Sequence, residues 1–241
     1  MMFKQVAMLL LSISLISCSQ QPKRTNIAGS GYSFSADTHV VIAEAVVSGL
    51  QIRLVRQSGE GVSHCKSDFK DHIELNGPIG PDSTFIVAKY LNQAQKCYYH
   101  QGQNWEATNV YLNSSGGYLT DGFELGRLFR SEDVSVRVVG DQQCSSSCAV
   151  AFLGGRYRWL RQKAKLTFHA PYRKNSYGQE KCSSITQSQD LKNYYAEMVG
   201  KEIGNTLFDR TMSYCGSNKG WTINSDAARA YGILNDKTHL E

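Results

Sequence analysis

Residues 140–155 read GDQQCSSSCAVAFLGG and lie between two apolar runs, Val134–Val139 (VSVRVV) and Lys165–His169 (KLTFH). The β-branched residues of both runs are typical of strands, whereas the small residues of Ser147–Leu153 favour a short helix. Three consecutive serines therefore stand where a strand gives way to a helix. A serine there lies beside unpaired helix N–H groups, which suits a nucleophile, although an N-cap serine is the simpler interpretation of this stretch alone.

The same alternation of strands and helices extends along the chain. Two short apolar runs predict strands, and two amphipathic stretches predict helices, in the order His72–Leu75, Thr84–Gln95, Asn109–Leu112 and Tyr118–Arg130. Strands that alternate with helices pair in parallel through right-handed crossovers, which predicts an α/β fold. Downstream, residues 187–203 predict one longer helix, and residues 224–232 predict a last helix with N-cap candidates at its start and a glycine at its end.

The composition limits the class of protein. The chain has 241 residues, of which 41% are hydrophobic, so it can bury a core and is not intrinsically disordered. The formal net charge of +5 arises from 26 Lys and Arg against 21 Asp and Glu. Such an excess is too small for a surface that tracks phosphates, and we expect no nucleic-acid partner.

The first 17 residues have the plan of a secretory signal peptide. Met1–Lys4 form a positive end, and Val6–Ile16 form an apolar stretch that is too short to span a bilayer. The sequence LISC that follows resembles the bacterial lipobox, in which cleavage precedes the cysteine and its thiol takes a diacylglycerol. The resemblance implies that Cys18 is the lipid anchor, and Ser19 after it implies the outer membrane of the cell envelope, on the periplasmic face. The alternative is an ordinary signal peptide with a chance cysteine.

The segments after the signal differ in character. Residues 18–35 are polar and rich in Gly and Ser, as expected of a lipidated tether. The extension 36–70 contains the run HVVIAEAVVSGLQIRLV, which fits strands or a helix followed by a strand, and periodicity does not decide between them. Residues 71–241 carry the regular pattern and predict a single α/β domain.

Two further segments place special residues at the ends of predicted strands, where open α/β sheets gather their sites. Asn113–Gly117 (NSSGG) follows one strand and precedes a helix, so its two glycines permit a tight turn with N–H groups that could hold an oxyanion. Leu166–Pro171 (LTFHAP) places His169 at a strand end, where an imidazole could accept a serine proton. Taken singly, a plain turn and a structural histidine are the commoner interpretations.

Taken in order, five stretches resemble the proteolytic subunit of Clp protease, in the Clp/crotonase superfamily: HIELNGPIG, YLNSSGG, CSSSCAVAFLGG, LTFHAP and AARAYGI. They span roughly residues 71–235. The Cys-x-Ser-x-Cys arrangement, with FLGG and FHAPY, is similar to a group of extracytoplasmic bacterial Clp-like proteins. The resemblance implies a single domain built as a spiral of β-β-α units with a mainly parallel sheet.

The resemblance also implies roles for individual residues. Counting back from Gly155 places the nucleophile at Ser146, with His169 as the general base. The N–H groups of Ser147 and Gly117 would form the oxyanion hole. The family has an acid near the position of Gly220, but this chain has none there, and the nearby Asn218 is the candidate third member, able to orient an imidazole without a carboxylate's stabilisation of the imidazolium. A Ser146–His169 dyad without a third member is the alternative.

Six cysteines remain after Cys18, and an even number in an exported chain implies disulfides. We expect the pairs Cys144–Cys148, Cys182–Cys215 and Cys65–Cys97, the first of which would brace the nucleophile turn. Zinc is a weaker alternative, because no CxxC pair or accompanying histidine has ligand spacing. Catalysis by a cysteine inside the helix is weaker still, and we expect neither a metal nor a cofactor.

The function that these residues favour is a lipid-anchored serine hydrolase, of peptidase type, that forms an acyl-enzyme. Its substrate would be a peptide or an unfolded protein, because the unfoldase that serves Clp in the cytosol is not expected outside it. Family members commonly form rings, so a homo-oligomer is an option. A binding or assembly lipoprotein with a degenerate site is the alternative, favoured by the missing acid. Crotonase-like acyl-CoA chemistry is a third class, but it needs a cofactor not expected outside the cytoplasm.

Overall fold

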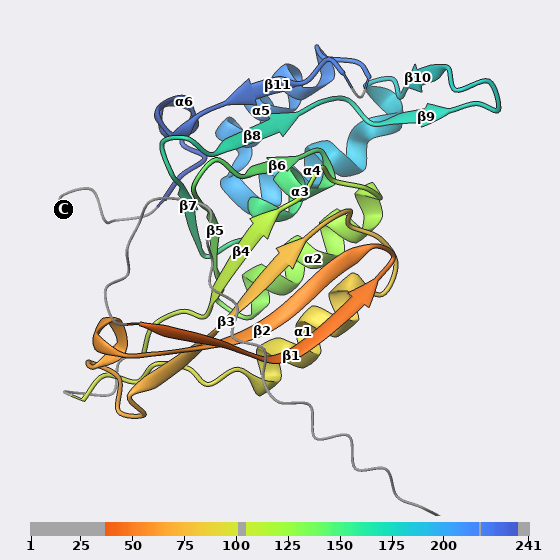
Figure 1. Ribbon diagram of the computed structural model, residues 1–241. Coiled ribbons are helices and arrows are strands. Elements are labelled where there is room, and N and C mark those ends of the chain that lie inside the picture. The colour runs from red at the N-terminus through yellow and green to blue at the C-terminus, as the bar shows by residue number, and fades with distance from the viewer. Residues whose placement is uncertain (1–36, 101–104, 217, 236–241) are drawn as a thin grey trace, which may run out of the picture.

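The computed structural model of the chain describes residues 37–100, 105–216 and 218–235 (Figure 1). The predicted signal peptide 1–17, the lipidation site Cys18 and the tether 18–35 lie outside the described residues. Within the described part, no helix is both long and apolar enough to cross a bilayer.

A six-stranded sheet forms the centre of the fold, with strand order β1-β2-β3-β4-β5-β7 (Figure 1). Its strands are β1 (Thr38–Val47), β2 (Leu50–Ser58), β3 (Phe69–Asn76), β4 (Asn109–Asn113), β5 (Ser135–Val138) and β7 (Tyr157–Leu160). Strands β3, β4, β5 and β7 pair in parallel, as the alternation of strands and helices predicts. Strands β1, β2 and β3 pair antiparallel, so the sheet is mixed but mainly parallel around the site.

The extension 36–70 resolves into two strands and belongs to this sheet. Strands β1 and β2 form a hairpin whose turn, Ser48–Gly49, has positive φ at both residues, as a tight two-residue hairpin turn requires. Strand β2 then pairs along its whole length with β3, and the short helix η1 (Glu60–Val62) lies in the connection. The single domain therefore begins at β1, upstream of the expected boundary at residue 71.

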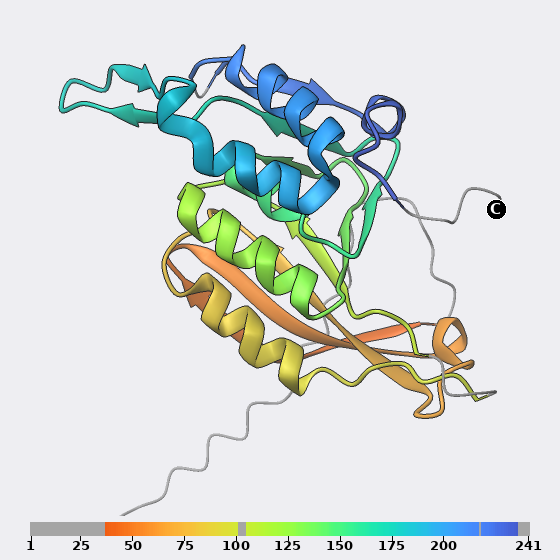
Figure 2. The same ribbon diagram turned by 180° about the vertical axis from the view of Figure 1, so that it is seen from behind.

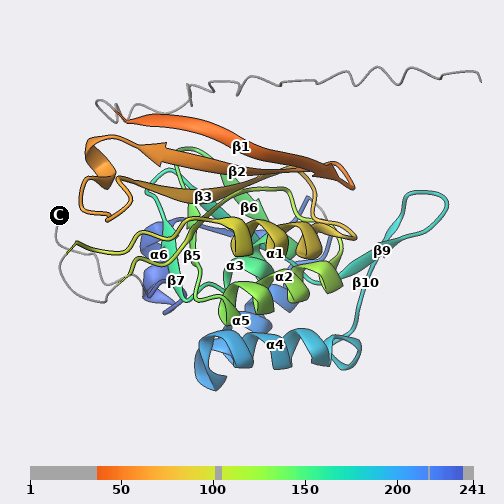
Figure 3. The same cartoon turned by 90° about the horizontal axis from the view of Figure 1, so that it is seen from below.

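Helices α1 (Ser83–Gln93) and α2 (Leu119–Ser131) lie side by side on one face of the central sheet (Figures 2 and 3). Both have the apolar side that the sequence predicts, and Leu125 and Phe129 of α2 are fully buried. Helix α3 (Ser147–Phe152) is buried along its entire length and packs against α2 through glycines. A Cβ on Gly122 would lie 2.7 Å from the carbonyl oxygen of Ser147, and one on Gly126 would lie 3.2 Å from the Cα of Ala151, so the glycines of α2 allow the close approach of α3.

A second sheet of three strands, in the order β11-β8-β6, stands beside the first. Its strands are β6 (Gln143–Ser145), β8 (Lys165–Phe168) and β11 (Trp221–Ile223). Strand β6 runs parallel to β8, and β11 runs antiparallel to it. A β-bridge between Ser114 and Cys144 joins this sheet to the end of β4. The segments that follow β4, β6 and β8 consequently meet at one edge.

The C-terminal part differs from the prediction of a single helix at 187–203. The chain forms η2 (Thr186–Ser188), α4 (Gln189–Val199) and a separate helix α5 (Lys201–Met212). The break falls at Gly200, which has φ 87° and ψ 156°, a conformation outside the helical region that glycine adopts without steric cost. Helix α6 (Ser225–Ala230) matches the predicted last helix, and the side chain of Asn224 caps it by accepting a hydrogen bond from the N–H of Ala227. The hairpin of β9 (Tyr172–Lys174) and β10 (Glu180–Cys182) projects from the body (Figure 1).

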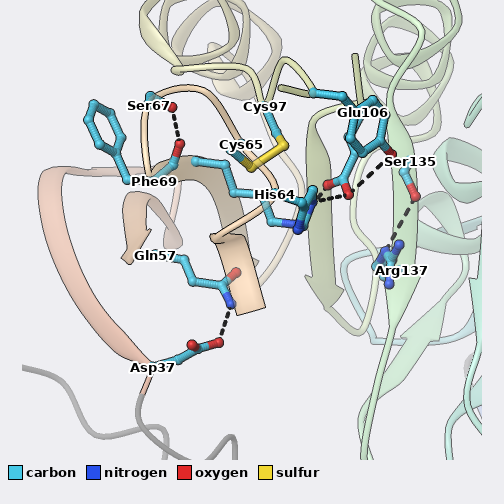
Figure 4. A network of polar contacts seen from close by, with 12 residues as sticks. Asp37, Gln57, His64, Cys65, Ser67, Phe69, Cys97, Glu106, Ser135 and Arg137 are labelled. Atoms are coloured by element: carbon cyan, nitrogen blue, oxygen red, sulfur yellow. Dashed lines mark hydrogen bonds and ion pairs between the residues drawn. A yellow bond between two sulfur atoms is a disulfide. The ribbon is translucent and has the colours of Figure 1, made fainter. Parts of the chain in front are cut away.

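At the far end of the β2–β3 hairpin, a polar network surrounds one disulfide (Figure 4). Glu106 accepts a hydrogen bond from Lys70 Nζ at 2.7 Å and pairs with His64 Nε2 at 2.8 Å. Burial by itself would raise the pKa of the Glu106 carboxyl, but the hydrogen bonds and charges of Lys70 and His64 outweigh it and hold this pKa below its usual range. Next to this network, the buried Cys65 and Cys97 are joined in a disulfide that ties the loop after β2 to the segment after α1.

Candidate active site at the strand ends

Ser146 occupies a sharp turn between β6 and α3. Its φ of 56° and ψ of −126° lie in a region that residues with a Cβ rarely adopt. Such a conformation costs on the order of 1–3 kcal/mol and persists only where the surroundings enforce it. The N–H of Ser146 donates to the carbonyl oxygen of Thr167 at 2.8 Å, and its own carbonyl accepts from the N–H of Val150 at 3.1 Å. The turn is thereby fixed between strand β8 and the first turn of α3, with the serine partly exposed.

The predicted glycine turn after β4 packs directly against this serine. A Cβ on Gly116 would lie 2.6 Å from the Cβ of Ser146, and Gly116 has φ 97°. A Cβ on Gly117 would clash with the carbonyl oxygen of Ile79. The N–H of Tyr118 donates to that same oxygen at 3.0 Å. Gly116 approaches Ser146 and Gly117 approaches Ile79 too closely for any residue with a Cβ. Glycine at both positions therefore lets the turn after β4 lie beside Ser146.

Two backbone N–H groups next to Ser146 are free to donate. Gly116 donates its N–H to Ser114 Oγ at 3.0 Å, whereas the exposed Gly117 donates to no group among the described residues. The N–H of Ser147, the first residue of α3, likewise has no acceptor in the described chain. An unpaired N–H at a helix start carries partial positive charge. These are the two groups predicted to form the oxyanion hole, and their unpaired state is what that role requires.

The side chain of Ser147 points away from the turn. Its Oγ is buried without a hydrogen-bond partner in the described structure, and the residue is 1% exposed. It faces α2, where a Cβ on Gly122 would lie 2.9 Å from the Ser147 Cβ. Ser147 can thus contribute its N–H to the site but not its hydroxyl, which leaves Ser146 as the better placed nucleophile of the two.

His169 follows directly after β8 and is partly exposed. Its Nδ1 lies 3.0 Å from the carbonyl oxygen of Ala170. A carbonyl can only accept, so Nδ1 carries the proton in this contact and Nε2 keeps a free lone pair in the neutral ring. That is the tautomer that a general base needs. The ring also packs against Tyr172, with centroids 5.4 Å apart.

Strands β6 and β8 place Ser146 and His169 at the same edge of the small sheet. Ser145 pairs with Thr167 in the parallel register, so Ser146 lies one position beyond the pair on β6 and His169 two positions beyond it on β8. No direct hydrogen bond joins the Ser146 hydroxyl to the His169 ring among the contacts of the described residues. The register places the two residues at the same edge of the sheet, and in the described structure their side chains make no hydrogen bond with each other.

Asn218 lies in the loop between α5 and β11 and is exposed. This loop passes beside the histidine: the N–H of Ala170 donates to the carbonyl of Tyr214 at 2.7 Å, and Gly220 approaches Thr167 so closely that a Cβ would overlap its methyl group. No hydrogen bond between Asn218 and His169 is present in the described part. The role of Asn218 therefore stays a prediction, and the contact that orients the imidazole comes from Ala170, which sequence reasoning missed because a backbone carbonyl leaves no signature.

All three expected disulfides are present: Cys144–Cys148, Cys182–Cys215 and Cys65–Cys97. Cys144 and Cys148 flank the nucleophile turn with their Cα atoms 5.2 Å apart, and both are fully buried. The bond closes the turn covalently from the last strand residues to the first turn of α3. Cys182–Cys215 ties the β9–β10 hairpin to the loop beside His169.

One group of side chains in the described chain has a spacing that could hold a metal: His64, Cys65 and Cys97. Its two sulfur atoms are bonded to each other in the disulfide, so they are not free to act as thiolate ligands. This group lies at the far end of the β2–β3 hairpin and contributes nothing to the Ser146 site.

The chain was compared with family models, curated protein sequences and solved structures, and only solved structures are similar to it. No family model and no curated protein sequence matches the chain. Among solved structures, it is similar to a point mutant of the 1510-N membrane-bound stomatin-specific protease (TM-score 0.53, 12% identity, 67% of this chain and 75% of that chain). The chain shares its fold with this protease.

A second point mutant of the same protease, in complex with a substrate peptide, gives a TM-score of 0.52 at 13% identity, over 67% of this chain and 71% of that chain. A point mutant of ClpP1 from Listeria monocytogenes gives 0.45 at 16% identity, over 67% of this chain and 86% of that chain. The likeness to the two mutants of the stomatin-specific protease shows a shared fold, and at 12% and 13% identity it shows nothing about the chemistry of this chain.

Proposed function

We propose that this chain is a serine hydrolase of peptidase type, which acts through an acyl-enzyme formed on Ser146. The observation that carries the proposal is the backbone of Ser146, a non-glycine residue held at positive φ at the junction of β6 and α3. Strained residues of this kind cluster at functional sites, and a helix cap alone does not require the strain. The fold that the chain shares with the 1510-N stomatin-specific protease supports the peptidase class.

The proposed mechanism uses groups that the site already orients. Ser146 Oγ attacks the carbonyl carbon of the substrate while His169 Nε2 accepts the hydroxyl proton. The N–H groups of Gly117 and Ser147 donate to the resulting oxyanion, a contribution of about 3 kcal/mol for one such donor in comparable enzymes. The protonated His169 then gives its proton to the leaving group, and an acyl ester remains on Ser146. Water activated by His169 hydrolyses the ester and restores the site.

In this proposal the carbonyl oxygen of Ala170 takes the place of the carboxylate that accepts a hydrogen bond from the histidine in a full triad. Ala170 O fixes the ring and its tautomer, but it does not stabilise the imidazolium as a carboxylate would. We therefore expect slow turnover compared with a full triad. Because Ser146 and His169 make no direct hydrogen bond among the described contacts, the proposal requires their side chains to come within hydrogen-bond reach when substrate binds, as often happens when catalytic hydrogen bonds tighten in the substrate complex.

A fluorophosphonate probe tests the proposal, because it forms a stable adduct only with an activated serine. The wild-type domain and the Ser145→Ala and Ser147→Ala variants should be labelled, whereas Ser146→Ala and His169→Ala should not. Ser147→Ala is the matched control, since it removes a neighbouring hydroxyl and keeps the backbone N–H. Unlabelled but natively folded wild-type protein would refute the hydrolase.

A binding or assembly protein with a degenerate site is the second candidate. The observations that favour it are the absence of a carboxylate contact to His169 and of a direct Ser146–His169 hydrogen bond among the described residues. The labelling experiment separates the two functions. A folded domain that binds peptides with unchanged affinity in the Ser146→Ala variant, and that is never labelled, would support this alternative.

We further propose that the protein is anchored in the bacterial cell envelope through a lipid on Cys18, at the periplasmic face of the outer membrane. Support comes from the lipobox-like LISC sequence and from three disulfides, which form and persist outside the reducing cytoplasm. In cells fed radiolabelled palmitate, the wild-type chain should take up label and Cys18→Ala should not. A peptide substrate and a homo-oligomer remain expectations from the resemblance.

A further inference from the structure

Three arginines line a cavity of about 400 Å³ behind the candidate active site. The cavity lies among the C-terminal end of α2, the start of β7, the end of α4 and Asn235, and its arginines are Arg130, Arg156 and Arg158. Helix α3 begins at the Ser146 turn and ends at this cavity, since Arg158 contacts the carbonyls of Leu153 and Gly155 just beyond the helix. The cavity is therefore separate from the site of the proposed hydrolase.

Two of these guanidinium groups are held by carbonyl oxygens. Arg158 is 5% exposed and donates through Nε to Ile233 O at 2.6 Å and through Nη1 to Gly155 O at 3.0 Å. Arg130 donates through Nε to Gly154 O at 3.0 Å and through Nη2 to Met198 O at 2.9 Å. These bonds fix both planes, yet they leave Nη2 of Arg158 and Nη1 of Arg130 without a partner among the described residues.

The described residues neutralise the positive charge of the cavity only in part. Arg130 and Arg158 both donate to Leu153 O, so two like charges lie side by side, and no carboxylate of the described chain pairs with either. Arg156 has a loose ion pair with Asp133 at 3.8 Å, in which both side chains are more than half exposed. Burial, and next the charge of Arg130, lower the pKa of Arg158 to about 10, which leaves it charged at neutral pH.

The partial negative charges of the helix ends near the cavity explain why arginines lie there, but they do not balance the charge of three arginines. The carbonyls that hold them follow the C-terminal ends of α3 and α6 or belong to the end of α4, and each helix end offers about half a negative charge. These three ends and Asp133 together fall short of three full positive charges. The one free terminal nitrogen of each guanidinium keeps two N–H donors, which can form charge-assisted hydrogen bonds with an oxyanion.

We propose that this cavity is a binding site for a phosphate-class oxyanion, in which Arg130 and Arg158 donate from fixed positions and Arg156 closes the open side. A phosphate group suits it better than a single carboxylate, because it carries up to two charges and offers more acceptor oxygens to three guanidinium groups. The site is independent of catalysis at Ser146.

Titration of the purified domain with inorganic phosphate tests this site. Calorimetry measures the affinity, and the midpoint of thermal unfolding measures the stabilisation by bound phosphate. Arg156→Gln is the informative variant, because the Arg156 side chain is exposed and, among the described residues, donates no hydrogen bond to the backbone. Arg173→Gln on the distant β9 strand is the matched control, with the same change in charge. Wild type and Arg173→Gln should bind with equal affinity, and Arg156→Gln about tenfold more weakly. No binding to wild type, or equal affinity in both variants, would overturn the proposal.

The carboxylates of residues 236–241, which follow Asn235 directly, are the other source of an oxyanion. A variant that ends at Asn235 distinguishes the two sources. An unchanged phosphate affinity supports a site for a free anion. Binding that appears only after truncation would overturn the proposal, because the chain's own C-terminal segment would then be the occupant.

Discussion

The N–H of Ser146 donates to the carbonyl oxygen of Thr167 at 2.8 Å, two residues before His169 on strand β8. This single bond sets the candidate nucleophile and the candidate base on neighbouring strands at one edge of the small sheet. Together with the close contact of Gly116, this bond holds Ser146 in its strained backbone conformation.

Replacement of Gly116 by alanine should abolish activity. The new Cβ would lie 2.6 Å from the Ser146 Cβ, and the residue has φ 97°, so both packing and backbone conformation oppose the change. We expect a loss of about 2–4 kcal/mol in the free energy of unfolding. Gly178→Ala is the control, since Gly178 also has positive φ but has no neighbour within 4 Å, and it should cost about 1 kcal/mol and keep activity. Equal effects of the two changes in chemical denaturation and in labelling would contradict the packing argument.

Removal of the Cys144–Cys148 disulfide should affect activity more than stability. A bond that closes so short a loop contributes about 2 kcal/mol by chain entropy, whereas Cys182–Cys215, with a sequence separation of 33, contributes about 4 kcal/mol. We expect the Cys144→Ala/Cys148→Ala double variant to remain folded and to lose at least tenfold in the rate of probe labelling, because the Ser146 turn loosens. An unchanged labelling rate in the folded variant would show that the disulfide does not position the nucleophile.

Ser147→Ala should be neutral or stabilising. The hydroxyl of Ser147 is buried without a partner in the described structure, so its removal relieves an unsatisfied polar group worth about 1 kcal/mol. Labelling of Ser146 should persist, since the backbone N–H is retained. A destabilisation of more than about 1 kcal/mol in urea unfolding would indicate that the hydroxyl has a partner after all.

Glu106 should make stability depend on pH in the acid range. Its folded-state pKa is lowered, so its contribution is fully present above the unfolded pKa of about 4.3 and is lost as the pH falls through the folded value. At pH 7 we expect Glu106→Gln to cost about 1–2 kcal/mol, because the part-buried ends of Lys70 and His64 lose their partner. Urea unfolding of both proteins from pH 7 to pH 3 should show the difference shrink toward acid pH. A difference that stays constant across this range would exclude the ionised carboxyl as its cause.

The sequence predicts much of this fold because its strands alternate cleanly with amphipathic helices. Strands β3, β4, β5 and β8 and helices α1, α2, α3 and α6 lie within a few residues of their expected positions, and the three disulfide pairs are confirmed. The prediction of a single helix at 187–203 was wrong. The helical periodicity of the sequence continues on both sides of Gly200, so it does not reveal that the backbone of Gly200 leaves the helical conformation. The crotonase-like spiral of β-β-α units stays a prediction.

The site is less visible in the sequence than the fold. Ser146, His169, Gly117 and Ser147 could be selected by motif order, but their roles stay predictions until chemistry is measured. Gly116 was missed as the residue that contacts Ser146, because its importance depends on a packing distance between two loops. The same applies to the carbonyl oxygens of Thr167 and Ala170, since every residue has one and only the fold selects which is used.

Peptide mapping by tandem mass spectrometry, after exposure of the purified domain to a fluorophosphonate, tests most directly whether Ser146 is the nucleophile. We expect one adduct, on Ser146, that disappears in the His169→Ala variant while that variant retains its circular dichroism spectrum. An adduct on Ser145 or Ser147, or a folded wild-type domain without any adduct, would show that Ser146 is not an activated nucleophile.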